Sequence, residues 1–201
     1  GPRDPEHLAL RADAEELRAT REAQIATFLT SLLALLCLPE DLSVVAVAGH
    51  SLGELTALVA AGVLTPQAGL HLVAERGEAM QAAASDRPGT MAAVLGLEWD
   101  RVVAVLKDVE NAWPANDNAP GHVVVSVTGD GVRAAGDALK AAGARRVLPL
   151  PVGGAFHTPL MEPAQERLDA ALAITSYAAP TIPAYANTTA EPYGFDVADL
   201  L

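Results

Sequence analysis

The order of apolar and polar residues in the first third of the chain predicts a helix, a strand and a second helix. Residues 12–21 are charged and helical in composition, and residues 25–37 form an apolar run that predicts a buried helix. After a break at Pro39, residues 43–48 are apolar and β-branched, which is typical of a parallel strand covered on both faces. Residues 54–61 are again helical in composition. The local order is therefore strand, tight turn, helix.

From residue 90 the pattern changes to short strands that alternate with helices. We predict strands at 91–97, 112–116, 123–128 and 146–152, and helices at 99–109 and 130–143, the second capped by Asp130 and stopped by Gly143. This β-α-β-β-α-β order is the ferredoxin-like pattern. We therefore expect an α/β core formed by residues 1–89 and 151–201, with a ferredoxin-like subdomain inserted at residues 90–150.

Composition narrows the class of protein. The chain has 201 residues, of which 51% are hydrophobic and 19% charged, as in an ordinary folded domain. Its 13 Lys and Arg against 25 Asp and Glu give a net charge of -12, which disfavours nucleic-acid binding. A single Cys excludes an intramolecular disulfide and a Cys-rich zinc site. No apolar run is long enough to span a membrane, and no secretory signal is visible, so we expect a cytoplasmic protein.

Candidate chemistry centres on the motif Gly49-x-Ser51-x-Gly53. A serine on a sharp strand-to-helix turn has a strained backbone that projects its hydroxyl outward, and glycines on either side allow close backbone approach. The helix N-terminus that follows would let the amide of Leu52 stabilise an oxyanion. The same motif can be a plain turn in a chain rich in Gly and Ala. The strand before it and the helix after it favour a nucleophile.

A serine hydroxyl needs a base to become a nucleophile. His157 is the candidate, because it lies in a Gly-rich loop at residues 153–159, and loops held by a rigid sheet often carry catalytic side chains. The alternative is a surface histidine without a role. The other histidines are His7 near the terminus, His50 beside the serine, His71 in a helix and His122 at the start of a strand.

Four motifs occur in order along nearly the whole chain. They are GHSLGE at 49–54, ERGEAM at 75–80, PANDNAPGHVVVS at 114–126 and LPVGGAFHTPLMEPA at 150–164. In order and spacing they resemble the malonyl-CoA:acyl-carrier-protein transacylases, relatives of the acyltransferase domains of fatty-acid and polyketide synthases. The resemblance implies a parallel-sheet, α/β-hydrolase-like core with an inserted ferredoxin-like subdomain, in agreement with the pattern of elements.

The resemblance also implies a mechanism. Ser51 would accept a malonyl group from the coenzyme A thioester, with His157 as the base and Leu52 as an oxyanion-hole amide. The phosphopantetheine thiol of an acyl carrier protein would then take the malonyl group. No metal or other cofactor is expected, because both bonds that break are activated acyl bonds.

Arg76 is the most informative residue for the choice of substrate. A malonyl group ends in a free carboxylate, which a guanidinium can hold by two parallel hydrogen bonds. A hydrolase for neutral esters has no use for that clamp. Without the resemblance, Arg76 would be interpreted as a solvent-facing helix residue paired with Glu75 or Glu78.

Three further residues match positions near the substrate in the family that the chain resembles. Phe156 is similar to the malonyl-preferring pattern, in which a bulky side chain leaves little room for a 2-methyl group. Asn118 matches a position near the acyl group, although a plain turn residue explains it nearly as well. His50 lies beside the nucleophile and is assigned to substrate binding. His122, where the family usually has Gln, has no interpretation.

The sequence also departs from the family. No G-Q-G-S-Q-type loop precedes Gly1, and Leu201 comes before the family's closing segments. Gly1 and Pro2 look like a protease-cleavage scar, so we expect a chain truncated at both ends and weak or inactive alone. The rival functions are a serine esterase or thioesterase of the α/β-hydrolase type and a catalytically impaired fragment. The esterase needs an acid between serine and histidine, and Asp130 lies there without a recognisable acid loop.

Charge bears on the protein partner. Acyl carrier proteins are acidic, and a chain with a net charge of -12 repels them unless its docking face is locally basic. The basic residues of the inserted subdomain include Lys107, Lys140, Arg145 and Arg146, and we expect docking near the last two. Ordinary solvated ends of helices and strands are the alternative. The pathway, fatty-acid or polyketide, and the oligomeric state leave no mark in the sequence.

Overall fold

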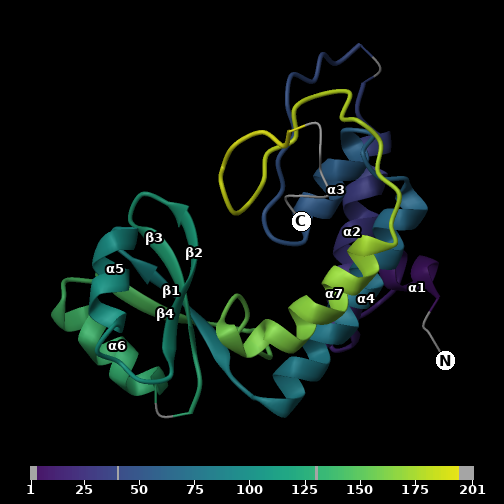
Figure 1. Cartoon of the computed structure of the whole chain (residues 1–201). Helices are drawn as coiled ribbons and strands as arrows, with labels where there is room; N and C mark the ends of the chain where they lie inside the picture. The colour runs from purple at the N-terminus through teal and green to yellow at the C-terminus, as the bar shows by residue number, and fades with distance from the viewer. Residues whose placement is uncertain (1–3, 40, 130, 195–201) are drawn as a thin grey trace. The chain divides into compact units, whose positions relative to one another are not determined.

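Two compact units make up the chain in the computed structural model, which describes residues 4–39, 41–129 and 131–194 (Figure 1). The first unit comprises Gly1–Ala79 and Gln165–Leu201, and the second comprises Met80–Ala164. The boundaries expected at residues 90 and 150 fall inside the second unit. Gly1, Pro2 and the predicted cap Asp130 lie outside the described residues.

The first unit is built mainly from helices. Its elements are α1 (Pro5–Leu10), the short 3-10 helix η1 (Glu16–Arg18), α2 (Thr20–Leu36), α3 (Gly53–Ala60), most of α4 (Pro66–Asp86) and most of α7 (Glu162–Ala173). Its core centres on the fully buried Phe28, Leu58, Leu72 and Val73. Within the described ranges, no helix is both long enough and apolar enough to cross a membrane.

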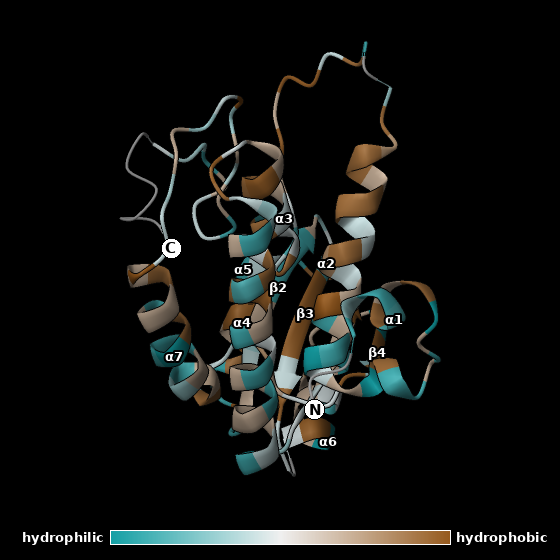
Figure 2. Ribbon diagram, turned by 90° about the vertical axis from the view of Figure 1, so that its right-hand side faces the viewer, coloured by the Kyte–Doolittle hydropathy of each residue, from teal (hydrophilic) through white to brown (hydrophobic). Residues whose placement is uncertain are grey.

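Helix α2 differs in part from the prediction of a buried apolar helix. Its buried residues, Gln24, Ile25, Ala26 and Phe28, all lie in its first half. Leu36, near its end, is 80% exposed, and Figure 2 shows apolar positions continuing to that end of the helix. The predicted helix is present, but the prediction that its second half is buried is wrong. Composition determines that a run is apolar, whereas burial requires a packing partner at each turn.

The strand predicted at residues 43–48 is also wrong. In the described residues this segment is extended and makes one isolated parallel bridge, between Val47 and Ala184. The Val47 N–H donates to the carbonyl of Pro183 at 2.8 Å, and the Tyr185 N–H donates to the Val47 carbonyl at 3.0 Å. Val45 remains 80% exposed. A β-branched run becomes a strand only where a second extended segment pairs with it along its length, and here a single residue is bridged.

The second unit contains a four-stranded antiparallel sheet. The order along the chain is β1 (Thr90–Leu95), α5 (Trp99–Leu106), β2 (Ala112–Ala119), β3 (His122–Val127), α6 (Gly131–Ala141) and β4 (Arg146–Leu150). This is the predicted β-α-β-β-α-β order, and the strands are arranged in the sheet as β2-β3-β1-β4. Figure 1 shows α5 and α6 on one side of the sheet. The chain is thus a mixed α/β protein with a small antiparallel sheet.

The core of the second unit explains why sequence pattern predicted it well. Val94 of β1 and Val123 and Val125 of β3 are buried against Val102 of α5 and Leu139 of α6. Each of these strands and helices turns apolar residues to this shared core, and the period of those residues along the chain indicates the type of element. The pattern therefore predicts the order of the elements, whereas the pairing of β1 with β4 joins segments far apart in the sequence.

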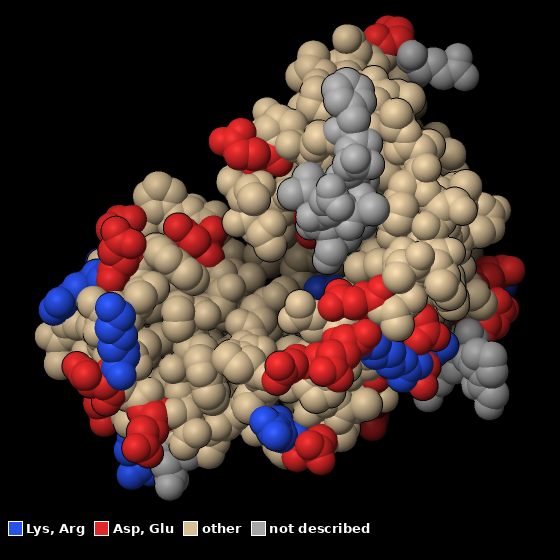
Figure 3. Space-filling model, in the orientation of Figure 1, with Lys and Arg blue, Asp and Glu red and all other residues tan. Residues whose placement is uncertain are grey.

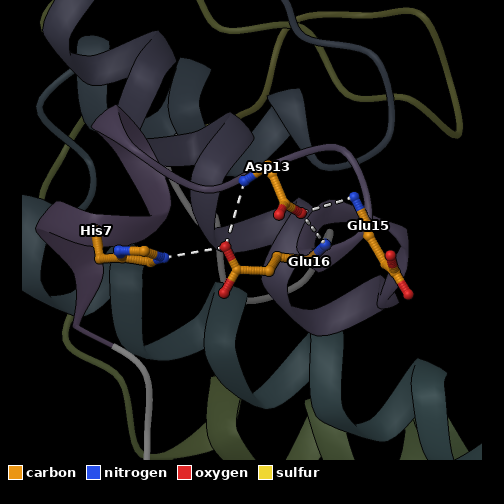
Figure 4. A network of polar contacts seen from close by, with 4 residues as sticks. All are labelled: His7, Asp13, Glu15 and Glu16. Atoms are coloured by element: carbon orange, nitrogen blue, oxygen red, sulfur yellow. Dashed lines mark hydrogen bonds and ion pairs between the residues drawn. The ribbon is translucent and has the colours of Figure 1, made fainter.

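A small polar network holds the turn that follows α1 (Figure 4). Asp13 Oδ1 accepts hydrogen bonds from the N–H groups of Glu15 and Glu16, both at 2.9 Å. Glu16 Oε2 accepts from the Asp13 N–H at 3.3 Å and lies 3.1 Å from His7 Nε2. His7 therefore belongs to the polar network that holds this turn.

Candidate active site

Ser51 sits in the turn that leads into α3, in a left-handed backbone conformation with φ 52°. The Gly53 N–H donates to the His50 carbonyl at 2.9 Å, and the Glu54 N–H donates to the Ser51 carbonyl at 3.1 Å. A residue with a Cβ pays roughly 1–2 kcal/mol for a left-handed conformation, so the surrounding bonds must hold it. The turn has the strained serine that the motif predicts.

The two motif glycines have different reasons to be there. A Cβ on Gly49 would collide with the carbonyl of Gly53, so only glycine fits at the start of the turn. A Cβ on Gly53 would meet nothing within 4 Å. The expectation that both glycines allow close backbone approach therefore holds for Gly49 and is wrong for Gly53, because the first turn of α3 leaves open space there.

Asn187 connects a distant segment to this turn. The Ser51 N–H donates to Asn187 Oδ1 at 2.7 Å, and Asn187 Nδ2 donates to the Gly49 carbonyl at 2.6 Å. The carboxylate oxygen Glu54 Oε1 accepts from the Asn187 N–H at 2.7 Å and from the Tyr193 hydroxyl at 2.5 Å. The sequence predicts no role for Glu54, Asn187 or Tyr193. Ser51 and Asn187 are 136 positions apart, so no local spacing indicates the contact.

The guanidinium of Arg76, on α4, lies against the serine. Arg76 Nη2 donates to Ser51 Oγ at 2.8 Å, and Nη1 donates to Gln24 Oε1, on α2, at 2.5 Å. Burial lowers the pKa of Arg76 to about 10, and the nearby carboxylate of Glu54 opposes that shift. A group with that pKa remains cationic at neutral pH. The site therefore combines a serine hydroxyl on a strained backbone with a positive charge held beside it.

The acidic neighbours of Arg76 are paired elsewhere. Arg167, on α7, lies 2.8 Å from Glu75 through Nη2 and 3.4 Å from Glu78. The hydrogen bond that Arg167 Nε donates to Glu75 Oε2 at 2.9 Å is the main cause that raises the pKa of Arg167. The alternative interpretation, in which Arg76 faces solvent and pairs with Glu75 or Glu78, is therefore wrong. Successive helix residues point in different directions, and Arg76 points to Ser51.

Gln24 is a site residue that sequence reasoning missed. It is 8% exposed, and its Oε1 accepts the second hydrogen bond from Arg76. Buried polar groups are normally hydrogen-bonded, and Arg76 is the partner here. Gln24 lies just before the apolar run predicted at 25–37 and follows the polar residues 20–22, so the sequence carried no signal of its burial.

The predicted role of Leu52 in binding the oxyanion requires that its backbone N–H is not used by another acceptor. Ser51, Gly53 and Glu54 each donate their backbone N–H to a partner named above. In the part of the chain that the structure describes, no hydrogen bond of the Leu52 N–H is found. At the N-terminus of α3, such an amide is suited to bind an anion.

His157 and Phe156 belong to a tightly built loop of the second unit. His157 is exposed and has a left-handed φ of 58°. The Phe156 carbonyl accepts from Ser126 Oγ at 2.6 Å, and Thr158 Oγ1 donates to the Ala155 carbonyl at 2.8 Å. The loop therefore fixes the backbone on both sides of His157. The pairing of His157 with Ser51, which is a residue of the first unit, stays a prediction.

The remaining predicted residues also divide between the units. Asn118 is exposed near the end of β2, beside a cavity of about 350 Å³ that Trp99 and Pro120 help to line. His50 is exposed in the first unit and borders an open pocket of about 470 Å³. The structure thus brings Arg76 to Ser51 within one unit, whereas the roles of Asn118 and His50 stay predictions.

Known proteins resemble the chain over nearly all its length. A family model described as the acyl transferase domain matches residues 6–198, and the chain belongs to this family. The malonyl CoA-acyl carrier protein transacylase of Bacillus subtilis is 39% identical over 189 residues, which cover 92% of this chain and 60% of the relative. The chain therefore spans about 60% of the length of this curated relative.

Solved structures agree with the family. A malonyl-CoA:acyl carrier protein transacylase from Xanthomonas oryzae superposes with a TM-score of 0.88 at 38% identity, covering 97% of this chain and 64% of the other. A type II polyketide synthase acyl-carrier protein in complex with its malonyl-transacylase matches with a TM-score of 0.87 at 33% identity, covering 98% of this chain and 68% of the matched chain.

Proposed function

We propose that the protein transfers a malonyl group from malonyl-CoA to the phosphopantetheine thiol of an acyl carrier protein, through an ester on Ser51. The contact of 2.8 Å between Arg76 Nη2 and Ser51 Oγ carries this proposal. It supports a substrate with a carboxylate close to the carbonyl that the serine attacks. The names of the relatives from Bacillus subtilis and Xanthomonas oryzae point to the same reaction.

In the first step, Ser51 Oγ attacks the thioester carbonyl of malonyl-CoA while His157 takes the hydroxyl proton. The Leu52 amide donates to the oxyanion that forms on the carbonyl oxygen. The intermediate collapses with cleavage of the carbon–sulfur bond. His157 returns its proton to the sulfur, coenzyme A leaves as a thiol, and a malonyl ester remains on Ser51.

In the second step, the thiol of the carrier's phosphopantetheine attacks the ester carbonyl, and His157 takes the thiol proton. The ester bond breaks, Ser51 Oγ recovers the proton, and the malonyl group leaves on the carrier as a thioester. Both bonds that break are activated acyl bonds, so the proposed chemistry needs no metal or other cofactor.

Four residues would select and hold the acyl group. Arg76 would bind the malonyl carboxylate by two parallel hydrogen bonds, as a planar guanidinium can. Phe156 would leave little room for a 2-methyl group. Asn118 and His50 would complete the substrate site. We also propose that the first unit belongs to a parallel-sheet, α/β-hydrolase-like core, for which the parallel Val47–Ala184 bridge is the support.

Intact-mass measurement after mixing the chain with malonyl-CoA tests the nucleophile. We expect the mass of one malonyl group to be added, and Ser51→Ala should abolish the addition. Supplying a carrier thiol should discharge the ester to the carrier faster than water does. Rapid release of free malonate without transfer would instead support the serine esterase alternative. No labelling at all would overturn the proposal for this chain and support the alternative of a catalytically impaired fragment.

A carrier-docking surface around Arg145 and Arg146 completes the proposal. Both residues are exposed in the second unit, and on the face that Figure 3 shows, Lys and Arg are scattered among Asp and Glu. Reversing both charges to Glu should raise the KM for the carrier and weaken its salt dependence. The matched control reverses Arg101 and Arg133, two other exposed residues of that unit. Equal effects of both pairs would contradict a local docking site.

A further inference from the structure

The side chain of Asn187 joins the two ends of the turn that presents Ser51. Its Oδ1 accepts from the Ser51 N–H at 2.7 Å, and its Nδ2 donates to the Gly49 carbonyl at 2.6 Å. A carboxamide is suited to this task because it offers an acceptor and a donor side by side. It thereby gives a partner to one donor and one acceptor of the turn that precedes α3.

These two bonds act on the residue with the least favourable backbone in the turn. Ser51 has φ 52°, a conformation that residues with a Cβ adopt only when their surroundings hold them there. Rotation of Ser51 toward a relaxed φ would turn its N–H away from Asn187. It would also move Oγ away from Arg76 Nη2, which lies 2.8 Å away.

The same bonds decide which amide of the turn is left for a substrate. The Ser51 N–H is directed to Asn187, and the Gly53 and Glu54 N–H groups donate to carbonyl oxygens within the turn. The Leu52 N–H remains as the amide that no described acceptor engages. Asn187 thus affects both the position of the hydroxyl and the choice of the oxyanion donor.

Asn187 is itself held in place by a second set of bonds. Its N–H donates to Glu54 Oε1 at 2.7 Å, and the same oxygen accepts from the hydroxyl of the buried Tyr193 at 2.5 Å. The backbone closes the segment around it, since the Tyr193 N–H donates to the Ala184 carbonyl at 2.8 Å. The Asn187 side chain is therefore supported from the helix that follows the serine and from its own segment.

We propose that Asn187 is a positioning residue, which holds Ser51 in its left-handed conformation for attack and leaves the Leu52 amide for the oxyanion. This inference rests on the proposed function. It goes beyond it by assigning the geometry of the nucleophile to a residue that does not touch the reacting atoms. We call the two hydrogen bonds of the Asn187 side chain, to the Ser51 N–H and to the Gly49 carbonyl, the brace. Removing the brace should slow acylation at saturating malonyl-CoA without weakening the binding of malonyl-CoA, because Arg76 and Gln24 are unchanged.

The first test is the rate of Ser51 malonylation, followed by intact mass, in Asn187→Ala. We expect the saturating rate to fall roughly 10- to 100-fold, since a displacement of about 1 Å at a reacting group can cost about 100-fold. The half-saturating malonyl-CoA concentration should change little. The matched control is Thr188→Ala, an exposed neighbour with no bond to the turn among those found in the described residues, and it should react at the original rate.

The second test is Asn187→Asp, whose protonation state imitates or breaks the brace. A protonated aspartic acid offers one donor and one acceptor, as the carboxamide does, whereas the ionised form faces the Gly49 carbonyl with a second acceptor. Acylation relative to the unsubstituted chain should therefore be highest at low pH and fall as the new carboxyl ionises. This comparison is made on one folded protein, so it separates positioning from a folding defect.

The outcomes separate the two proposals. If the unsubstituted chain is malonylated and both Asn187 variants match it in rate and pH profile, the positioning role is overturned while the proposed function stands. If the unsubstituted chain is not malonylated, the proposed function fails. Hydrogen exchange of the Ser51 amide then decides the brace: it should be faster in Asn187→Ala and unchanged in Thr188→Ala, and equal exchange in all three proteins would overturn it.

Discussion

Replacing Arg76 by Met removes the guanidinium but keeps an unbranched side chain. A charge-assisted hydrogen bond contributes about 1.5–3 kcal/mol, so two to a malonyl carboxylate would contribute about 3–6 kcal/mol if they were simply added. They are not added, because Nη1 and Nη2 already donate to Gln24 and Ser51. When malonyl binds, the guanidinium exchanges these neutral partners for the carboxylate, so we take the net stabilisation of the transition state as about 2–3 kcal/mol. This corresponds to about 30- to 150-fold in rate at about 1.4 kcal/mol per tenfold.

The assay compares kcat/KM for malonyl-CoA and acetyl-CoA with the same thiol acceptor. Acetyl-CoA has no terminal carboxylate, so it provides the internal control for the reactivity of Ser51. Arg76→Met should lower kcat/KM for malonyl-CoA by about 30- to 150-fold and change that for acetyl-CoA much less. Arg76→Lys should lie between, since an ammonium keeps the charge but loses the two-pronged geometry.

Two results would refute the reasoning. An equal fall in kcat/KM for both acyl donors would mean that Arg76 acts on Ser51 or on the fold and does not bind the malonyl carboxylate. An unchanged preference for malonyl-CoA would mean that the carboxylate is bound elsewhere. Thermal unfolding of the variants separates loss of folding from either result.

Two further predictions concern stability. Gly49→Ala should prevent the first unit from folding, because the added Cβ collides with the Gly53 carbonyl. Gly53→Ala should stabilise the unit by about 0.5–1 kcal/mol, because its Cβ meets open space at the start of α3 and alanine is the better helix former. Thermal unfolding of the two variants checks the contrast. Burial, then the hydrogen bond to Glu54, raises the pKa of Tyr193 above its usual value of 10.0. The stability it contributes is therefore complete below pH 10 and is lost as pH rises through the folded value, so Tyr193→Phe should flatten the alkaline loss of stability measured by circular dichroism. Arg76, whose lowered pKa acts in the opposite direction, is common to both proteins, and an identical alkaline slope would contradict the assignment.

The sequence alone was sufficient where the signal lies within one segment of the chain. The alternation of strands and helices from β1 to β4 predicted the element order of the second unit, because the period of apolar positions inside each segment indicates a strand or a helix. The strained turn at Ser51 was predictable for a similar reason. Its glycine, serine and following helix lie within a few residues, and Gly49 is required by a clash with the backbone four positions on.

Tertiary structure decided what depended on distant partners. The β-branched run at 43–48 had the composition of a strand, but pairing is a property of two segments, and only Val47 bridges to Ala184. Arg76 had acidic neighbours in sequence, yet Arg167 takes them and the guanidinium turns to Ser51. Asn187 had no visible role until folding brought it across 136 positions to the serine. Local pattern specifies which element a residue joins, whereas the partner of a polar side chain is set only when remote segments meet.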